Sequence, residues 1–250
     1  RSLAALGMTG ILSAVSALTA CPLVRLTALS ILTVLSACPL ARLSAQTGVV
    51  HDPFPIRLVF TGDINLGTRT LDDGIPPDSG RGLFSQVLPL LSSDLVVGNF
   101  EGVLSDSGES EKCAPKSTHC YSFATPTWLA DRLREAGFTH LNFANNHAND
   151  YGLDARRHSE ATIRALGMTP YGPLEEVAIT PVWRDERMTL VGIVGFTTYP
   201  HAYNLLDLAG SAAIVSAVRP LVDVLVVTFH GGAEGTGAVR VPMRAEFLGK

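Results

Sequence analysis

Four clusters of polar residues in the sequence carry side chains that can bind a metal ion or move a proton. They are Asp63; Asn99 with Glu101; Asn145, Asn146 and His147; and His230 with Glu234. Together they offer carboxylate oxygens, amide oxygens and imidazole nitrogens, and no thiolate. Such donors suit ions of the Zn, Mn, Fe or Mg class, so the sequence predicts a divalent metal site. Two ions bridged by a carboxylate would bind a phosphoryl oxygen and lower the pKa of a bound water.

Each cluster closely follows a short apolar run that is typical of a buried strand. Strands are predicted over residues 56–60, 95–97, 140–144, 188–196 and 223–229. Helices are predicted over residues 83–91, 127–136 and 153–166. Strands that alternate with helices indicate an α/β fold with a largely parallel central sheet. Because the carboxyl ends of parallel strands converge at one edge of a sheet, we expect the four clusters to lie together there.

Each cluster also has a purely structural interpretation. Asp63 could belong to a turn and cap a following helix, and residues 145–146 and 149–152 are equally typical of turns. His230 stands beside two glycines, which could simply mark a tight loop. Four such coincidences at four strand ends favour the metal site over four unrelated turns. The other histidines are expected in loops, on the surface or half-buried; they are His51, His119, His140, His158 and His201.

Other chemistries find less support in the sequence. The Gly-x-Ser-x-Gly elbow of α/β-hydrolases and the Gly-Lys-Ser/Thr of a phosphate-binding loop are both absent. Residues 62–67 have the wrong glycine spacing for a dinucleotide site, and they place an acid where phosphates would be repelled. A net charge of −4 over 250 residues argues against nucleic acid as a partner.

The first 45 residues differ in kind from the rest of the chain. They contain three arginines and no acidic residue, which leaves a net charge of −7 for the remainder. Residues 3–24 and 26–41 are uncharged and rich in Leu, Ala, Ser and Thr, as in a secretory signal or a membrane span. A segment of this region recurs after 17 positions. Each of its two copies contains a sequence that resembles a lipobox and ends in a cysteine, Cys21 or Cys38, and these two cysteines are candidates for lipidation. Simple cleavage near Ala45 and an uncleaved anchor are the alternatives.

These features predict a leader over residues 1–45 and a linker over residues 46–55. The protein is accordingly expected outside the cytoplasm, in the cell envelope, either membrane-anchored or secreted. Two further cysteines agree with this expectation. Cys113 and Cys120 lie in a polar segment, and their spacing does not match the short spacing of a zinc knuckle. A disulfide formed in an oxidising compartment fits them better than two unrelated thiols.

Four motifs occur in an order that resembles a known family. They are GDINLG at residues 62–67, NFE at 99–101, NNHANDYG at 145–152 and HGGAE at 230–234. Together they resemble the CapA, or poly-gamma-glutamate capsule biosynthesis, family, whose fold is similar to that of calcineurin-like metallophosphoesterases. The resemblance covers residues 56–250 and implies a layered α/β sandwich over that range. The Asn-His-Ala-x-Asp-x-Gly stretch is its most specific part.

The resemblance also implies a role for individual residues. Asp63, Glu101, Asn146 and His230 would be metal ligands, with Glu101 as the bridging carboxylate. His147 would be catalytic, stabilising or protonating the leaving oxygen. The supporting residues would be Asn65, Asn99, Asn145, Asp150 and Glu234.

The sequence departs from the family pattern at two places. The first strand of metallophosphoesterases usually carries Asp-x-His, whereas Asp63 is followed by Ile64 and Asn65. A later Gly-His-x-Pro-His-like segment, which supplies further histidines in family members, is not found before Lys250. The domain is therefore expected to be truncated at its C-terminus.

Two functions remain open at this stage. The first is an exported, metal-dependent hydrolase of the phosphoesterase type, which acts in capsule polymer synthesis or export. The second is a non-catalytic envelope component that binds or guides an anionic polymer on the same fold. The expected partners are an anionic polymer or phosphoester substrate, the membrane through the leader, and membrane-bound components of a polymer synthase.

Overall fold

The computed structural model describes residues 55–114, 117, 120–233, 236–238 and 240 of the chain. All of them belong to one compact unit, residues 52–250. The expected leader (1–45), the linker up to residue 54, Cys21, Cys38 and Glu234 lie outside the described residues. Within the part that is described, none of the helices combines the length and the apolar run needed to cross a bilayer.

Four parallel strands form the first sheet, in the order β1-β2-β5-β6. Their bounds are Leu58–Ile64 for β1, Leu95–Phe100 for β2, His140–Asn142 for β5 and Thr169–Tyr171 for β6. The register of β1 on β2 shifts between Phe60 and Asp63, so that Asp63 is paired with Asn99. Gly98 makes this irregular approach possible, because a Cβ there would collide with the side chain of Ile64.

The second sheet has the order β10-β8-β7, and β9 pairs with the end of β8. The bounds are Ala178–Arg184 for β7, Arg187–Thr197 for β8, Tyr203–Asn204 for β9 and Val224–His230 for β10. β7 and β8 form an antiparallel hairpin, whereas β10 runs parallel to β8. Two short strands, β3 (Val103–Leu104) and β4 (Ala124–Thr125), pair with each other.

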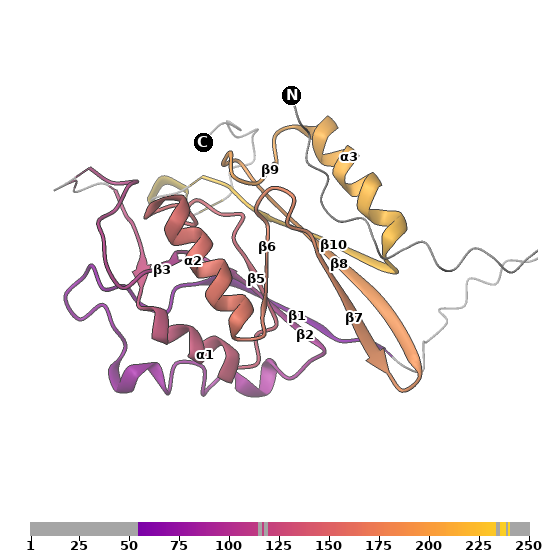
Figure 1. The fold of residues 1–250 in the computed structure, drawn as a ribbon, viewed down its shortest axis with the longest axis horizontal. Helices are drawn as coiled ribbons and strands as arrows, with labels where there is room; N and C mark the ends of the chain where they lie inside the picture. The colour runs from indigo at the N-terminus through magenta and orange to yellow at the C-terminus, as the bar shows by residue number, and fades with distance from the viewer. Residues whose placement is uncertain (1–54, 115–116, 118–119, 234–235, 239, 241–250) are drawn as a thin grey trace, which may run out of the picture. The chain divides into compact units, whose positions relative to one another are not determined.

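The two sheets are stacked face to face, and helices cover their outer faces (Figure 1). Along β2, Val96 and Phe100 pack with the helical layer of α1 and α2, while Leu95 and Val97 pack toward the second sheet. This alternation follows from the two-residue period of a strand. Strand β8 repeats it: residues 191 and 193 face the first sheet, and 194 and 196 face α3. The expected layered α/β sandwich with a parallel sheet is confirmed by this packing.

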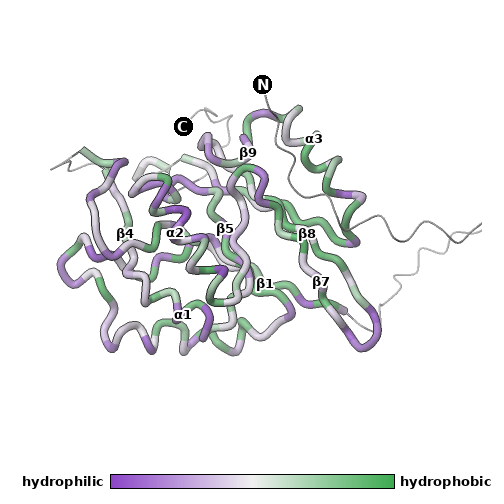
Figure 2. Tube along the Cα trace, in the orientation of Figure 1, coloured by the Kyte–Doolittle hydropathy of each residue, from purple (hydrophilic) through white to green (hydrophobic). Residues whose placement is uncertain are grey.

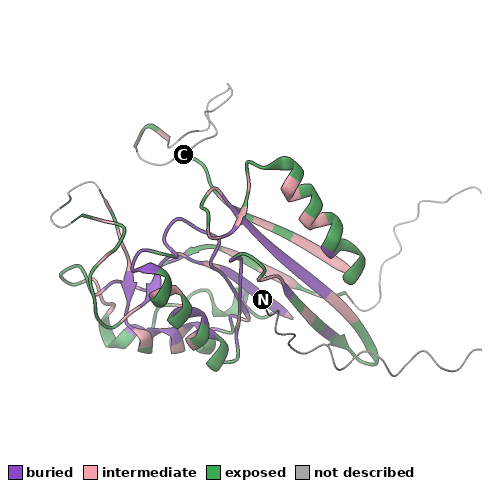
Figure 3. Ribbon diagram, turned by 45° about the horizontal axis from the view of Figure 1, so that its top comes forward, coloured by how far each residue is buried: buried purple, intermediate pink, exposed green. Residues whose placement is uncertain are grey.

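Among the described residues, three α-helices lie outside the sheets. They are α1 (Ala130–Glu135), α2 (Gly152–Ala165) and α3 (Leu208–Val218). The predicted helices over 127–136 and 153–166 are confirmed, the first beginning with the 3-10 turn η3 (Thr127–Leu129). Four further 3-10 turns complete the described elements: η1 (Pro77–Gly80), η2 (Leu88–Leu90), η4 (Arg219–Leu221) and η5 (Thr236–Ala238). Figure 2 shows the contrast in hydropathy between strands such as β8 and the polar connections, and Figure 3 shows how much of α3 is exposed.

Two expectations from the sequence are wrong. The helix predicted over residues 83–91 is a series of turns that ends in η2, because Pro89 has no N–H to donate and cannot continue a helix. His140 is fully buried at the start of β5, 2% exposed, and is neither a loop nor a half-buried residue. Its Nδ1 and Nε2 lie 2.8 Å from the hydroxyls of Thr139 and Thr180, so neutral polar partners satisfy the ring between the two sheets.

Candidate metal centre

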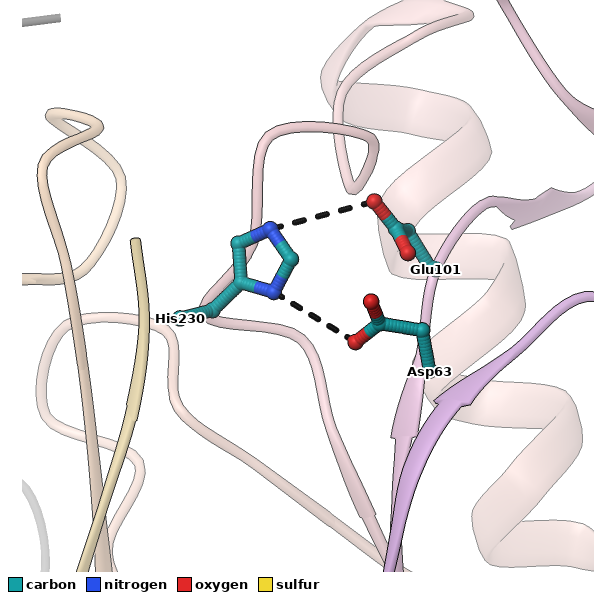
Figure 4. A group of neighbouring side chains, drawn as sticks. All are labelled: Asp63, Glu101 and His230. Atoms are coloured by element: carbon teal, nitrogen blue, oxygen red, sulfur yellow. Dashed lines mark ion pairs between the residues drawn. The ribbon is translucent and has the colours of Figure 1, made fainter. Parts of the chain in front are cut away.

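Three side chains from both sheets meet at the carboxyl ends of the strands (Figure 4). Asp63 stands near the end of β1, Glu101 directly after β2, and His230 at the end of β10. The Nδ1 atom of His230 lies 3.5 Å from Oδ1 of Asp63, and its Nε2 atom lies 3.8 Å from Oε1 of Glu101. One ligand atom from each residue lies within 4.8 Å of the others. The fold therefore brings Asp63, Glu101 and His230 together, as the sequence predicted.

Asn99 connects this cluster to the buried part of the first sheet. Its Nδ2 atom donates to Oδ1 of Asp63 at 2.8 Å and lies 3.2 Å from Nδ1 of His230. Its Oδ1 atom accepts hydrogen bonds from Nδ2 of Asn142 and Nδ2 of Asn145, at 2.8 and 3.0 Å. Because both ends of the amide are used, Asn99 holds the carboxylate of Asp63 in a fixed orientation. Asn99, predicted as a supporting residue, thus contacts Asp63, and Asn145 contacts Asn99.

Asn146 and His147 close the other side of the cluster. Oδ1 of Asn146 lies 3.0 Å from Nε2 of His230, and Nε2 of His147 lies 3.8 Å from Oε1 of Glu101. The turn that carries them is fixed by Asn145, whose Oδ1 accepts the backbone N–H of His147 at 3.0 Å. Asn145 therefore stabilises a turn, and Asn146 in the same turn contacts the cluster. The interpretation of this motif as a turn and its interpretation as part of a metal site do not exclude each other.

His147 is held by a buried carboxylate. Its Nδ1 atom lies 2.7 Å from Oδ2 of Asp150, whose side chain is completely buried. Nζ of Lys112 lies 3.2 Å from Oδ1 of Asp150 and 3.1 Å from Nδ1 of His147. An ionised carboxylate can only accept, so the 2.7 Å contact places a proton on Nδ1 and leaves the ammonium of Lys112 to pair with Asp150. The ring is thereby turned so that Nε2 faces Glu101.

The donors present fit a divalent metal ion. Ligand atoms that share an ion at about 2.1 Å lie roughly 3.0–3.4 Å apart. The separations of 3.5 and 3.8 Å involve different ring nitrogens of His230, and one ion binds only one of them. With one ligand atom from each of Asp63, Glu101 and His230, the three atoms lie within 4.8 Å of one another, so rotations of these side chains would bring them to the separation that an ion requires. Two carboxylates, one imidazole and one amide oxygen are a donor set for ions such as Zn²⁺ or Mn²⁺. A cavity of about 250 Å³ opens on these residues and is also lined by Thr198 and Tyr199.

Of the predicted supporting residues, Asn65 contacts the turn after β1 and Glu234 is not among the described residues. Oδ1 of Asn65 accepts the backbone N–H of Gly67 at 2.9 Å, so Asn65 stabilises this turn. The alternative in which Asp63 caps a helix is wrong, since the chain after β1 enters turns and Asp63 accepts from Asn99. Cys113 and Cys120 form the predicted disulfide, with their Cα atoms 5.6 Å apart.

Sequence reasoning missed three residues of this region. Lys112 pairs with Asp150, the ring of Phe123 stacks on His147 at 4.4 Å between centroids, and Asn142 supports Asn99. Asn142 could have been found from the sequence, because it lies inside the predicted apolar strand 140–144, and a buried amide needs hydrogen-bond partners. Lys112 and Phe123 lie in a polar segment and gave no periodic signal.

Fold and site together define an α/β protein with an acid–imidazole cluster at the carboxyl edge of its strands. A family model described as "Bacterial capsule synthesis protein PGA_cap" matches residues 57–244, which include every described ligand of the cluster. The chain belongs to this bacterial capsule synthesis family. The resemblance inferred from the four motifs is thus confirmed.

Two curated relatives carry the CapA name. "Capsule biosynthesis protein CapA" of Bacillus anthracis is 32% identical over 146 residues, which are 57% of this chain and 34% of the relative. "PGA biosynthesis protein CapA" of Bacillus subtilis (strain 168) is 34% identical over 99 residues, 39% of this chain and 25% of the relative. The matched part thus spans about a third or less of these relatives.

A solved structure, a putative 5'-nucleotidase from Staphylococcus aureus in complex with alpha-ketoglutarate, also matches part of the chain. The identity is 16% and the TM-score is 0.40, over 71% of this chain and 37% of that one. These values describe a distant likeness in fold.

Proposed function

We propose that this protein acts at the cell envelope in the synthesis or export of a poly-gamma-glutamate capsule, as a metal-dependent hydrolase of the phosphoesterase type. Family membership supports the place in capsule synthesis. The observation that carries the chemical part is the convergence of Asp63, Glu101 and His230 within 4.8 Å, with His147 beside them. Export and a membrane-anchored or secreted location belong to the same proposal.

The residues of the chain supply the following chemistry. Asp63, Glu101 and His230 would hold a divalent ion, with the Asn146 amide oxygen as a further ligand. Such an ion, when bound, polarises a phosphoryl oxygen and lowers the pKa of a coordinated water. His147 presents Nε2 to the cluster; because Nδ1–H is bonded to Asp150, the form that can donate a proton from Nε2 to a leaving oxygen is the imidazolium, which carries a proton on both nitrogens and is left as the neutral ring. Asp150 keeps that ring in place through the 2.7 Å bond to Nδ1.

Metal content and hydrolysis, measured together on the 250-residue chain, test this proposal. The chain is purified without chelator, its metals are measured by plasma mass spectrometry, and turnover is followed with bis(p-nitrophenyl) phosphate. Glu101→Gln removes a ligand charge at constant size, so occupancy should fall. His147→Gln should keep the metal and lower kcat by about 10²- to 10⁴-fold, the usual worth of an acid–base group.

A matched control is Glu135→Gln, which removes an exposed carboxylate paired with Arg132 on α1. It should keep wild-type metal content and turnover. A folded wild-type protein that takes up no divalent ion even when Mn²⁺ or Zn²⁺ is supplied would refute the metal centre.

A second candidate function is metal-dependent binding of an anionic polymer without hydrolysis. It is favoured by the exposure of Asp63, whose side chain is 57% accessible, so that a carboxylate of a polymer can approach an ion held there. Retained metal, no turnover, and polymer binding that is lost in Glu101→Gln would select this function over hydrolysis.

A further inference from the structure

The loop between β3 and β4 contacts the His147–Asp150 pair from both of its sides. The first side is residues 110–112. The backbone N–H groups of Glu111 and Lys112 donate to the carbonyl oxygen of Asp150 at 2.9 and 3.2 Å, and Oγ of Ser110 donates to the same oxygen at 3.1 Å. Three donors on one carbonyl fix this side of the loop to the turn that carries His147.

The side chain of Lys112 continues this contact into the site. Its Nζ atom lies 3.2 Å from Oδ1 of Asp150 and 3.2 Å from the carbonyl oxygen of Asn146. A completely buried carboxylate needs a nearby positive charge or several donors, because burial removes its hydration. Lys112 supplies that charge while remaining 29% exposed itself. It therefore offsets the lost hydration of the carboxylate that orients His147.

The other side of the loop is Phe123. Its backbone N–H donates to Oδ2 of Asp150 at 2.7 Å, the same oxygen that receives Nδ1 of His147. Its ring lies against the imidazole, with 4.4 Å between the centroids. The imidazole is thus confined on one face by Phe123 and at Nδ1 by Asp150.

A disulfide joins the two sides of this loop. Cys113 follows Lys112 directly, and Cys120 precedes Phe123 by three residues. The bond between them restricts the separation of the two sides, since a cross-link removes conformations in which the loop ends part. Reduction of this bond would leave each side held by its own contacts alone.

We propose that this disulfide-closed loop is a clamp that orients His147, and that Lys112 is its positioning residue. The catalytic consequence rests on the proposed function of His147, but the orientation itself does not. In the clamped state, Nδ1–H of His147 points at Asp150 and Nε2 at Glu101. Without the clamp, the ring samples other orientations and its Nδ1 proton exchanges with water.

The test compares variants of the 250-residue chain by NMR and by kinetics. Lys112→Met removes the charge and keeps the length of the side chain, and Lys112→Arg restores a charge. Cys113→Ser/Cys120→Ser opens the loop without altering any buried charge, so it serves even where Lys112→Met does not fold. Arg134→Met, which removes an exposed cation on α1, is the control.

The first readout is the slowly exchanging Nδ1–H resonance of His147, assigned by its loss in His147→Gln. It requires neither substrate nor metal. We expect exchange at least about tenfold faster in Lys112→Met and in the double cysteine variant, and wild-type behaviour in Lys112→Arg and Arg134→Met. With bis(p-nitrophenyl) phosphate, kcat should fall about 10- to 100-fold with KM and metal content unchanged, the range known for residues that orient another ligand or group.

The two proposals fail separately. An unchanged Nδ1–H resonance in both Lys112→Met and the double cysteine variant overturns the clamp, whatever the kinetics. A resonance that responds as expected, in a protein without any metal-dependent turnover, supports the clamp and contradicts the hydrolase. A fall in metal content together with kcat would mean that Lys112 acts on the metal centre, and this would also overturn its positioning role.

Discussion

Acid should destabilise this protein through His140, and the size of the effect follows from the structure. His140 is buried between the two sheets, and burial lowers its pKa from 6.5 to about 4. The folded protein therefore holds the ring neutral at a pH where the unfolded chain has already bound a proton. Above about pH 6.5, His140 does not change the free energy of unfolding with pH. As the pH falls from about 6.5 toward 4, the unfolded chain binds a proton that the folded protein does not, and the free energy of unfolding decreases.

The magnitude can be worked out from the two pKa values. One pKa unit corresponds to about 1.4 kcal/mol, so protonation of the unfolded chain costs the folded state about 2 kcal/mol at pH 5. The full difference approaches about 3 kcal/mol below pH 4. This is a large part of the 5–15 kcal/mol by which domains are usually stable.

The assay is urea unfolding of the wild type and of His140→Gln at pH 8 and at pH 5. Glutamine keeps one donor and one acceptor for Thr139 and Thr180 but does not titrate in this range. The free energy of unfolding of the wild type, relative to the variant, should fall by about 2 kcal/mol between the two pH values. All other titrating groups are shared, so the difference isolates His140.

His158→Gln, which replaces an exposed histidine on α2, controls for the loss of an imidazole as such. An equal pH dependence in the wild type and in His140→Gln would refute the reasoning. It would mean that the ring of His140 reaches water, or that the sheets rearrange to accommodate its charge.

Two further predictions concern the supports of the site. Asn99→Leu removes the amide that holds Asp63, and the metal dissociation constant should rise about 10- to 100-fold in a competition titration with a chromophoric chelator; an unchanged constant would show that Asp63 needs no such support. Gly195→Ala should destabilise by about 1–3 kcal/mol in urea unfolding, because its Cβ would stand 2.6 Å from Oδ1 of Asn142, whereas Gly82→Ala, with open space around it, should be nearly neutral. Equal stabilities of the two alanine variants would contradict this packing argument.

The sequence alone predicted much of the architecture, because local patterns carry it. Apolar runs of strand length, followed by Gly, Asn or acidic residues, indicate where the strands lie, and β1, β2, β5 and β10 are found there. Their ends differ from the prediction: β1 and β2 continue to Ile64 and Phe100, past the predicted ends at residues 60 and 97, because polar residues at the edge of a sheet can still pair with a neighbouring strand. The strands β6 and β7 and the helix α3 gave no prediction. The exposed positions of β7 include Ile179, Pro181 and Trp183, so its alternation in burial is not an alternation of apolar and polar residues in the sequence. Helix α3 is largely Ala and Ser, with little contrast between its faces.

What the sequence by itself determined is the set of chemical groups and their place at the carboxyl ends of strands. Which strands share a sheet, and which side chains therefore touch, was decided only by the tertiary structure. Asn99 and His230 lie 131 residues apart in the chain and in different sheets, yet they are in contact. Lys112 could not be found from its polar segment, because its role depends on a buried carboxylate that only the folded turn at residues 145–152 presents. Local patterns fix where a chain turns, whereas the burial of a charge depends on everything packed around it.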